Sequence, residues 1–123
     1  MPSQEAIAQT VNRYLELLAT GKADDVVTLY AAEATIEDPI GSDLLRGHDA
    51  IRAFYAGFQD AKKDTELAEL RVADSEAAFL WHLTLDAGET RTRISPISMM
   101  TFDEDAKITS MRACWSPSDV QVS

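Results

Sequence analysis

Cysteine, histidine and basic residues are scarce in this 123-residue chain. Its one cysteine, Cys114, excludes an internal disulfide and fits a reducing, cytoplasmic compartment, and we expect it to be a buried thiol. The 11 basic residues are outnumbered by 21 acidic ones, and the net charge of −10 disfavours nucleic acid and anionic membranes as partners. His48 and His82 stand at no metal-like spacing from each other or from Cys114, so the sequence predicts no metal site.

Long apolar runs are also missing. The longest runs, such as residues 77–81, are far too short to cross a bilayer, and the first five residues lack the basic start and apolar core of a signal peptide. The hydrophobic content of 46% is instead that of an ordinary globular protein. A chain of this length has no room for a second core, so we predict one domain over residues 1–123. The acidic balance favours a neutral or cationic small molecule as the ligand.

The first half of the chain has the periodicity of helices. Ser3 is a suitable N-cap for a first helix that ends at Gly21, where a left-handed residue is expected. A short second helix is predicted from about Ala23 to Tyr30, and a third opens at Gly47. The inward-facing positions of the first and third helices are Ile7, Val11, Tyr14, Leu15, Leu18, Ile51, Phe54, Tyr55 and Phe58.

The second half of the chain changes to the alternating pattern of strands. The predicted strands are Glu66–Val72, Ala77–Leu85, Thr90–Phe102 and Lys107–Trp115. Helices followed by meandering strands indicate an α+β domain, in which an antiparallel sheet carries the three helices on one face. Pro96 lies inside the third strand and predicts a bulge or a sharp bend, which would curve the sheet into a cup.

Asp38 is the most informative residue of the chain. In the alternating segment 34–40 it shares a face with Ala34, Ile36 and Ile40, and no lysine or arginine stands in the five residues before it. Burial among apolar neighbours disfavours the charged carboxylate, which raises its proton affinity and makes it a usable base near neutral pH. The alternative is a turn residue that caps the loop at Pro39.

Three tyrosines and one serine are further candidates. Tyr14, Tyr30 and Tyr55 fall on the inner faces of the three predicted helices, where converging phenols could satisfy one another; they could equally be separate core residues. Ser98 places a small hydroxyl on the apolar face of the third strand, where it could simply bond to a strand neighbour. On the opposite face, Ile97 and Met99 are apolar where water is expected. Such residues suggest a protein partner.

Several segments together resemble the bacterial steroid Δ5-isomerases, or ketosteroid isomerases. They are residues 14–17, 30–31, 34–39, 47, 54–55, 102–104 and 111–116. The spacing of the tyrosines and the Glu-Asp-Pro segment at 37–39 are fairly specific to that family. The resemblance implies a cone-shaped fold, which is also found in nuclear transport factor 2, polyketide cyclases and scytalone dehydratase.

The resemblance also implies roles for individual residues. Asp38 would be the general base that moves a proton from carbon 4 to carbon 6 of a 3-oxo-Δ5-steroid, without metal or cofactor. Tyr14 would donate a hydrogen bond to the dienolate oxygen, and Tyr30 and Tyr55 would hold Tyr14 in a hydrogen-bonded chain. Ser98 occupies the position at which the family has a protonated Asp, and as an alcohol it would be a weaker donor.

Substrate-contacting residues and a homodimer through the sheet are implied in the same way. The residues expected against the flat steroid are Phe54, Met111 and Trp115, although each could be plain core. Two other functions stay open. One is another enzyme on this fold, such as a dehydratase or cyclase, which would usually need a second acid–base group beside Asp38. The other is a non-catalytic module that binds lipophilic molecules.

Overall fold

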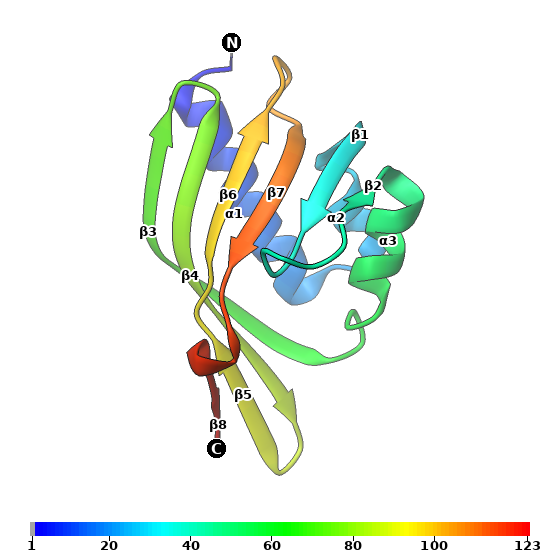
Figure 1. Cartoon of the computed structure of the whole chain (residues 1–123), viewed down its shortest axis with the longest axis vertical. Coiled ribbons are helices and arrows are strands. Elements are labelled where there is room, and N and C mark those ends of the chain that lie inside the picture. Colours follow the sequence, from blue (N-terminus) through cyan, green and yellow to red (C-terminus); the bar gives the residue numbers. More distant parts are fainter. Residues whose placement is uncertain (1) are drawn as a thin grey trace.

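The computed structural model describes residues 2–123, which form three α-helices on one side of a curved, eight-stranded sheet (Figure 1). The helices are α1 (Gln4–Thr20), α2 (Ala23–Val27) and α3 (His48–Ala56), and a 3₁₀ turn spans Pro117–Asp119. The strands are β1 (Tyr30–Glu37), β2 (Leu45–Arg46), β3 (Lys62–Ala73), β4 (Glu76–Ala87), β5 (Thr90–Ile94), β6 (Ile97–Phe102), β7 (Ile108–Cys114) and β8 (Val120–Val122). The predicted α+β class is confirmed.

The strand order is β2-β1-β7-β6-β4-β5-β8, with β3 paired to the other edge of β4. All pairs are antiparallel except β1 and β7, which run parallel with Tyr30 opposite Ile108 and Ile36 opposite Met111. The prediction of a wholly antiparallel sheet is therefore wrong at this pair. A meander dictates antiparallel pairing only between consecutive strands, whereas β1 and β7 are separated by most of the chain.

Pro96 bends the sheet without a bulge. The pairs Ile94–Leu83 and Ile97–Leu80 keep one register, so β5 and β6 follow each other along the same edge of β4. The Trp81 N–H donates to the Pro96 carbonyl at 3.2 Å, but proline has no N–H to return the bond. Beyond this point the lower part of β4 swings away together with β5 and β8 (Figure 1). A register shift between Leu67 and Glu69 bends β3 as well.

Helix α1 is set by its cap and by its apolar stripe. The Ser3 hydroxyl accepts the Ala6 N–H at 3.0 Å, as an N-cap does. The predicted inner positions are all buried, namely Ile7, Val11, Tyr14, Leu15 and Leu18. Gly21 ends the helix, but its φ of −94° is not left-handed, contrary to the prediction. The glycine is explained by close packing, because a Cβ there would lie 2.9 Å from the Leu17 carbonyl oxygen.

Three other predictions about local structure are wrong. The second helix ends at Val27, and Tyr30 begins β1, because backbone pairing with β7 draws the chain into the sheet. Ile40 is 38% exposed, since β1 ends at Glu37 and the chain then turns away from the apolar face. Cys114 is exposed, because it alternates on β7 with the buried Ala113 and so faces outward.

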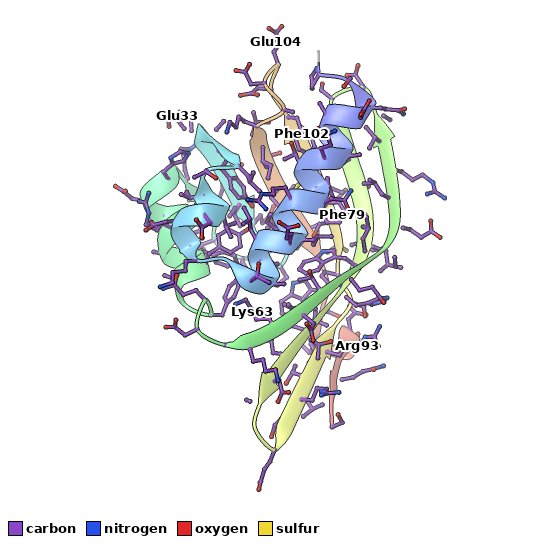
Figure 2. All side chains as sticks on the ribbon, turned by 180° about the vertical axis from the view of Figure 1, so that it is seen from behind. Glu33, Lys63, Phe79, Arg93, Phe102 and Glu104 are labelled. Atoms are coloured by element: carbon purple, nitrogen blue, oxygen red, sulfur yellow. The ribbon has the colours of Figure 1, made fainter. Side chains whose placement is uncertain are left out.

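One continuous core joins the helices to the inner face of the sheet. Phe79 and Phe102, labelled in Figure 2, are buried in it, whereas Glu104 lies in the exposed turn before β7. Within residues 2–123, none of the helices combines the length and apolar character that crossing a bilayer requires.

Candidate active site

A cavity of about 210 Å³ lies between the helices and the bent sheet. Its wall is mostly aromatic and aliphatic, with Phe54, Phe58, Leu83, Leu85, Ile94 and Pro96 among the lining residues. Polar groups reach it from Tyr14 of α1, Tyr55 of α3 and Asp38, which directly follows β1. A mostly apolar cavity with a few polar groups is typical of a site for a small apolar molecule.

The three tyrosines form a hydrogen-bonded chain. Tyr55 Oη lies 3.0 Å from Tyr14 Oη and 2.7 Å from Tyr30 Oη, and all three side chains are buried. Their convergence confirms that they are not separate core residues, although Tyr30 reaches the chain from a strand. Burial raises the pKa of each phenol well above its ordinary value, and the nearby Asp38 raises that of Tyr14 further. Tyr14 therefore keeps its proton as a hydrogen-bond donor at neutral pH.

Asp38 is half-buried at the cavity wall. Burial raises the pKa of its carboxyl, and the Trp115 indole, whose Nε1–H donates to Asp38 Oδ1 at 2.7 Å, offsets part of that rise. The turn that carries Asp38 is held by Glu37, which accepts the Gly41 N–H at 2.8 Å and the Arg112 Nε–H at 2.9 Å. The result is a fixed carboxylate that is readily protonated for an aspartate, as a general base requires.

Ser98 is 1% exposed on β6 and accepts the Trp81 Nε1–H at 2.9 Å. Trp81 comes from the neighbouring strand β4 and lines the cavity, whereas Ser98 is not among the lining residues. The indole of Trp81 also packs edge-on against Tyr14, with ring centroids 6.4 Å apart. Ser98 thus adjoins the cavity through Trp81.

The predicted substrate-contacting residues divide into two groups. Phe54 and Trp115 line the cavity, while Met111 is 1% exposed and belongs to the core instead. Sequence reasoning missed Trp81 as a lining residue. Its parity with the inward-facing Phe79 on β4 was the available signal.

Neither histidine lines the cavity. His48 Nε2 lies 2.9 Å from the Tyr30 carbonyl oxygen, and His82 Nδ1 lies 2.8 Å from Ser95 Oγ. In the part of the chain from residue 2 onward, no three His, Cys, Asp or Glu side chains gather in a way that could hold a metal ion.

Comparison with known proteins identifies the family. The model of the SnoaL-like domain family matches residues 11–111. A steroid Delta-isomerase from Nocardioides simplex is 46% identical over 116 residues, which are 94% of each chain. The chain belongs to the steroid Delta-isomerase family. The resemblance seen in the sequence is thereby confirmed.

Two solved structures share the fold of this chain. The epoxide hydrolase/cyclase-like enzyme SalBIII, which functions in pyran ring formation in the polyether salinomycin, superposes with a TM-score of 0.92 at 26% identity over the whole of both chains. RV0760c from Mycobacterium tuberculosis superposes with a TM-score of 0.90 at 17% identity, also over both whole chains, and shows the fold alone.

Proposed function

We propose that the protein is a steroid Δ-isomerase, which converts 3-oxo-Δ5-steroids into 3-oxo-Δ4-steroids. The observation that carries the proposal is one apolar cavity lined both by a half-buried carboxylate, Asp38, and by a buried phenol, Tyr14. The 46% identity to a steroid Delta-isomerase over almost the whole chain supports it.

The reaction needs one base and one hydrogen-bond donor. The Asp38 carboxylate removes a proton from carbon 4. The electron pair of that C–H bond forms a double bond between carbons 3 and 4, and the carbonyl π pair moves to the oxygen, which gives a dienolate. Tyr14 donates to this oxygen as charge develops on it, so the donor stabilises the transition state more than the neutral ketone. Asp38, now a carboxylic acid, returns the proton to carbon 6. The π pair between carbons 5 and 6 bonds this proton, the pair between carbons 3 and 4 moves to carbons 4 and 5, and the carbonyl re-forms. The net reaction only relocates a proton and a double bond within the substrate, and the proposed reaction therefore uses no metal or redox cofactor.

The remaining polar and aromatic residues support these two groups. Either hydroxyl can be the donor in both phenol pairs, and we propose that Tyr30 donates to Tyr55 and Tyr55 to Tyr14, so that the Tyr14 proton is available to the substrate oxygen. Ser98 is proposed as a second, weaker donor to that oxygen. Phe54 and Trp115 would contact the flat face of the steroid. Met111, which is buried in the core, would contribute to steroid binding by packing beneath the cavity wall.

A direct assay tests the proposal. Conversion of 5-androstene-3,17-dione creates a conjugated enone, whose ultraviolet absorbance reports turnover. We expect Asp38→Asn to lower kcat by about 10²–10⁴-fold, the usual contribution of a general base. Near-ultraviolet circular dichroism of the variant serves as the control for folding. An unchanged kcat would reject the role of Asp38.

The two competing functions are separated by the same assay. A dehydratase would usually place a second acid–base group beside Asp38, but His48 and His82 bond elsewhere. The fold shared with SalBIII keeps cyclase or epoxide hydrolase chemistry as the alternative reaction class. A module that only binds lipophilic molecules would bind phenols tightly without turning over the Δ5 substrate.

We also propose that the chain folds as one domain and forms a homodimer through the outer face of its sheet. One core cluster connecting helices and strands supports the single domain. Ile97 and Met99 are 48% and 39% exposed on β6, which leaves apolar surface for a second copy to cover. Light scattering at micromolar concentration should give the mass of two chains, and Ile97→Lys should reduce it to one. A monomer mass for the unaltered chain would overturn the dimer. The cytoplasmic location stays a prediction from the single cysteine.

A further inference from the structure

Trp81 connects the two proposed oxyanion donors. Its Nε1–H donates to Ser98 Oγ at 2.9 Å, and its ring packs edge-on against Tyr14 at an interplanar angle of 80°. The side chain is 5% exposed and lines the cavity. No role in the reaction as described above requires this residue.

The Ser98 hydroxyl has a free proton. A serine oxygen can accept a hydrogen bond and donate its own proton at the same time. Trp81 occupies the accepting side, and the side-chain hydrogen bonds found within residues 2–123 do not include one donated by Ser98. Buried donors without an acceptor are rare in folded proteins. Ser98 lies next to the cavity-lining Trp81, and a ligand oxygen that enters the cavity beside this indole would be the acceptor for the Ser98 proton.

The register of β4 against β6 brings Trp81 and Ser98 within hydrogen-bond distance on the inner face of the sheet. Phe79 of β4 lies opposite Ser98 of β6, and Trp81 is two residues further along the same inner face. The indole can therefore reach diagonally across to Ser98 while its ring forms part of the cavity wall. Since both partners are almost fully shielded from water, the bond should be stronger than at the surface and should polarise the Ser98 hydroxyl.

We propose that Trp81 is a positioning residue that orients the Ser98 hydroxyl toward the substrate oxygen already bound by Tyr14. This inference rests on the proposed isomerase function. It gives the oxyanion two donors, each at the end of its own chain: Tyr30 to Tyr55 to Tyr14, and Trp81 to Ser98. The indole N–H thereby compensates in part for the serine that stands where the family has an acid.

A double-mutant cycle in the full chain tests the inference through turnover. Ser98→Ala removes the donor and should lower kcat on the order of 10²-fold with little change in KM. Trp81→Phe keeps an aromatic wall but removes the N–H, and it should lower kcat about 3- to 10-fold. In the Ser98→Ala background, Trp81→Phe should cause no further loss. Independent losses that multiply would mean that Trp81 acts only through packing and would overturn the inference.

Binding of 2-naphthol separates this inference from the proposed function, because it needs no turnover. The naphthol oxygen can take the place of the dienolate oxygen between the two donors. Ser98→Ala should weaken the affinity, measured by fluorescence titration, about tenfold, and Trp81→Phe should weaken it less and not at all in the Ser98→Ala background. Trp115→Phe, which removes the other indole N–H of the cavity, is the matched control and should add its effect to that of Ser98→Ala.

The result that overturns the inference is Ser98→Ala binding 2-naphthol as tightly as the unaltered protein. If the protein does not turn over the Δ5 substrate but the double-mutant cycle in 2-naphthol affinity gives the expected result, only the isomerase function is rejected. Ser98→Cys, which keeps the size and a weak S–H donor, should fall between serine and alanine in affinity. This graded series keeps the test valid if the alanine variant is poorly folded.

Discussion

The two polar groups of the cavity are held in different ways. Asp38 is half-buried at the end of a strand and accepts one bond, from Trp115. Tyr14 is 2% exposed in the middle of a helix and belongs to a chain of three phenols that come from α1, α3 and β1. The base accepts one hydrogen bond and is partly open to water, whereas the donor is shielded from bulk water and reaches only the cavity.

Burial nevertheless prepares both groups for their tasks. Removal from water favours the neutral form of each side chain and so raises the pKa of both Asp38 and Tyr14. For the carboxyl this means a stronger base, and for the phenol it means a proton that stays available for donation. Burial thus favours proton acceptance by Asp38 and proton retention by Tyr14.

After removal of the base itself, the largest expected effect comes from removing the buried donor. Tyr14→Phe should lower kcat about 10²–10³-fold, the usual loss for one oxyanion donor, with little change in KM because the bond strengthens only as charge develops. Steady-state kinetics with 5-androstene-3,17-dione measures both constants. A rise in KM at constant kcat would mean that Tyr14 merely binds the ketone.

The middle of the phenol chain should matter more for stability than its end. Tyr55→Phe leaves the hydroxyls of Tyr14 and Tyr30 buried without a partner, at a cost of about 1–3 kcal/mol for each. Tyr30→Phe leaves the Tyr14–Tyr55 bond in place and should change the free energy of unfolding by less than about 1 kcal/mol. Urea denaturation compares the two variants. Equal losses in the free energy of unfolding would contradict the central position of Tyr55 in the phenol chain.

The cost of burying the base should appear as a gain in stability when its charge is removed. The folded-state pKa of Asp38 is raised above its ordinary value of 3.8, so protonation stabilises the fold below that value and this stabilisation is lost as pH rises through the folded pKa. Asp38→Asn should therefore have a higher Tm than the unaltered protein at pH 7. The difference should close as pH falls toward 3.8. A Tm difference independent of pH would contradict the cause given for the shift.

The smallest expected effect concerns the single support of the base. The Trp115 N–H stabilises the ionised form of Asp38, so Trp115→Phe should raise the pKa of that carboxyl further. Since the reaction needs the ionised base, the fall of kcat/KM at low pH should begin at a higher pH in this variant. Trp81→Phe, whose N–H bonds to Ser98, is the control and should leave this part of the pH profile in place.

Local pattern predicted the features that the periodicity of one segment determines. The stripe of α1 is buried at each predicted position, and the alternation on β6 places Ser98 inside and Ile97 outside as expected. These features depend on a periodicity that a short segment displays by itself. The convergence of the three phenols was one of two alternatives that the sequence left open, and their hydrogen bonds decide between them.

Features that depend on pairing between distant segments could not be predicted. Tyr30 has the spacing of a helical residue, but the parallel pairing of β1 with β7 makes it a strand residue. The bond between Trp81 and Ser98 depends on the register of β4 against β6, which no single segment specifies. Gly21 is fixed by contact with the Leu17 carbonyl and not by its own backbone angle.

The bend at Pro96 also has a consequence for selectivity. Leu83, Leu85 and Ile94 belong to the narrow ribbon of β4, β5 and β8 that projects beyond the helices (Figure 1), whereas Tyr14 and Tyr55 sit among three packed elements. A ribbon that projects beyond the helices can change its conformation to fit a ligand more readily than a packed core can. Substrates that share the oxygen-bearing ring but carry different substituents at the opposite end should therefore be turned over at similar rates.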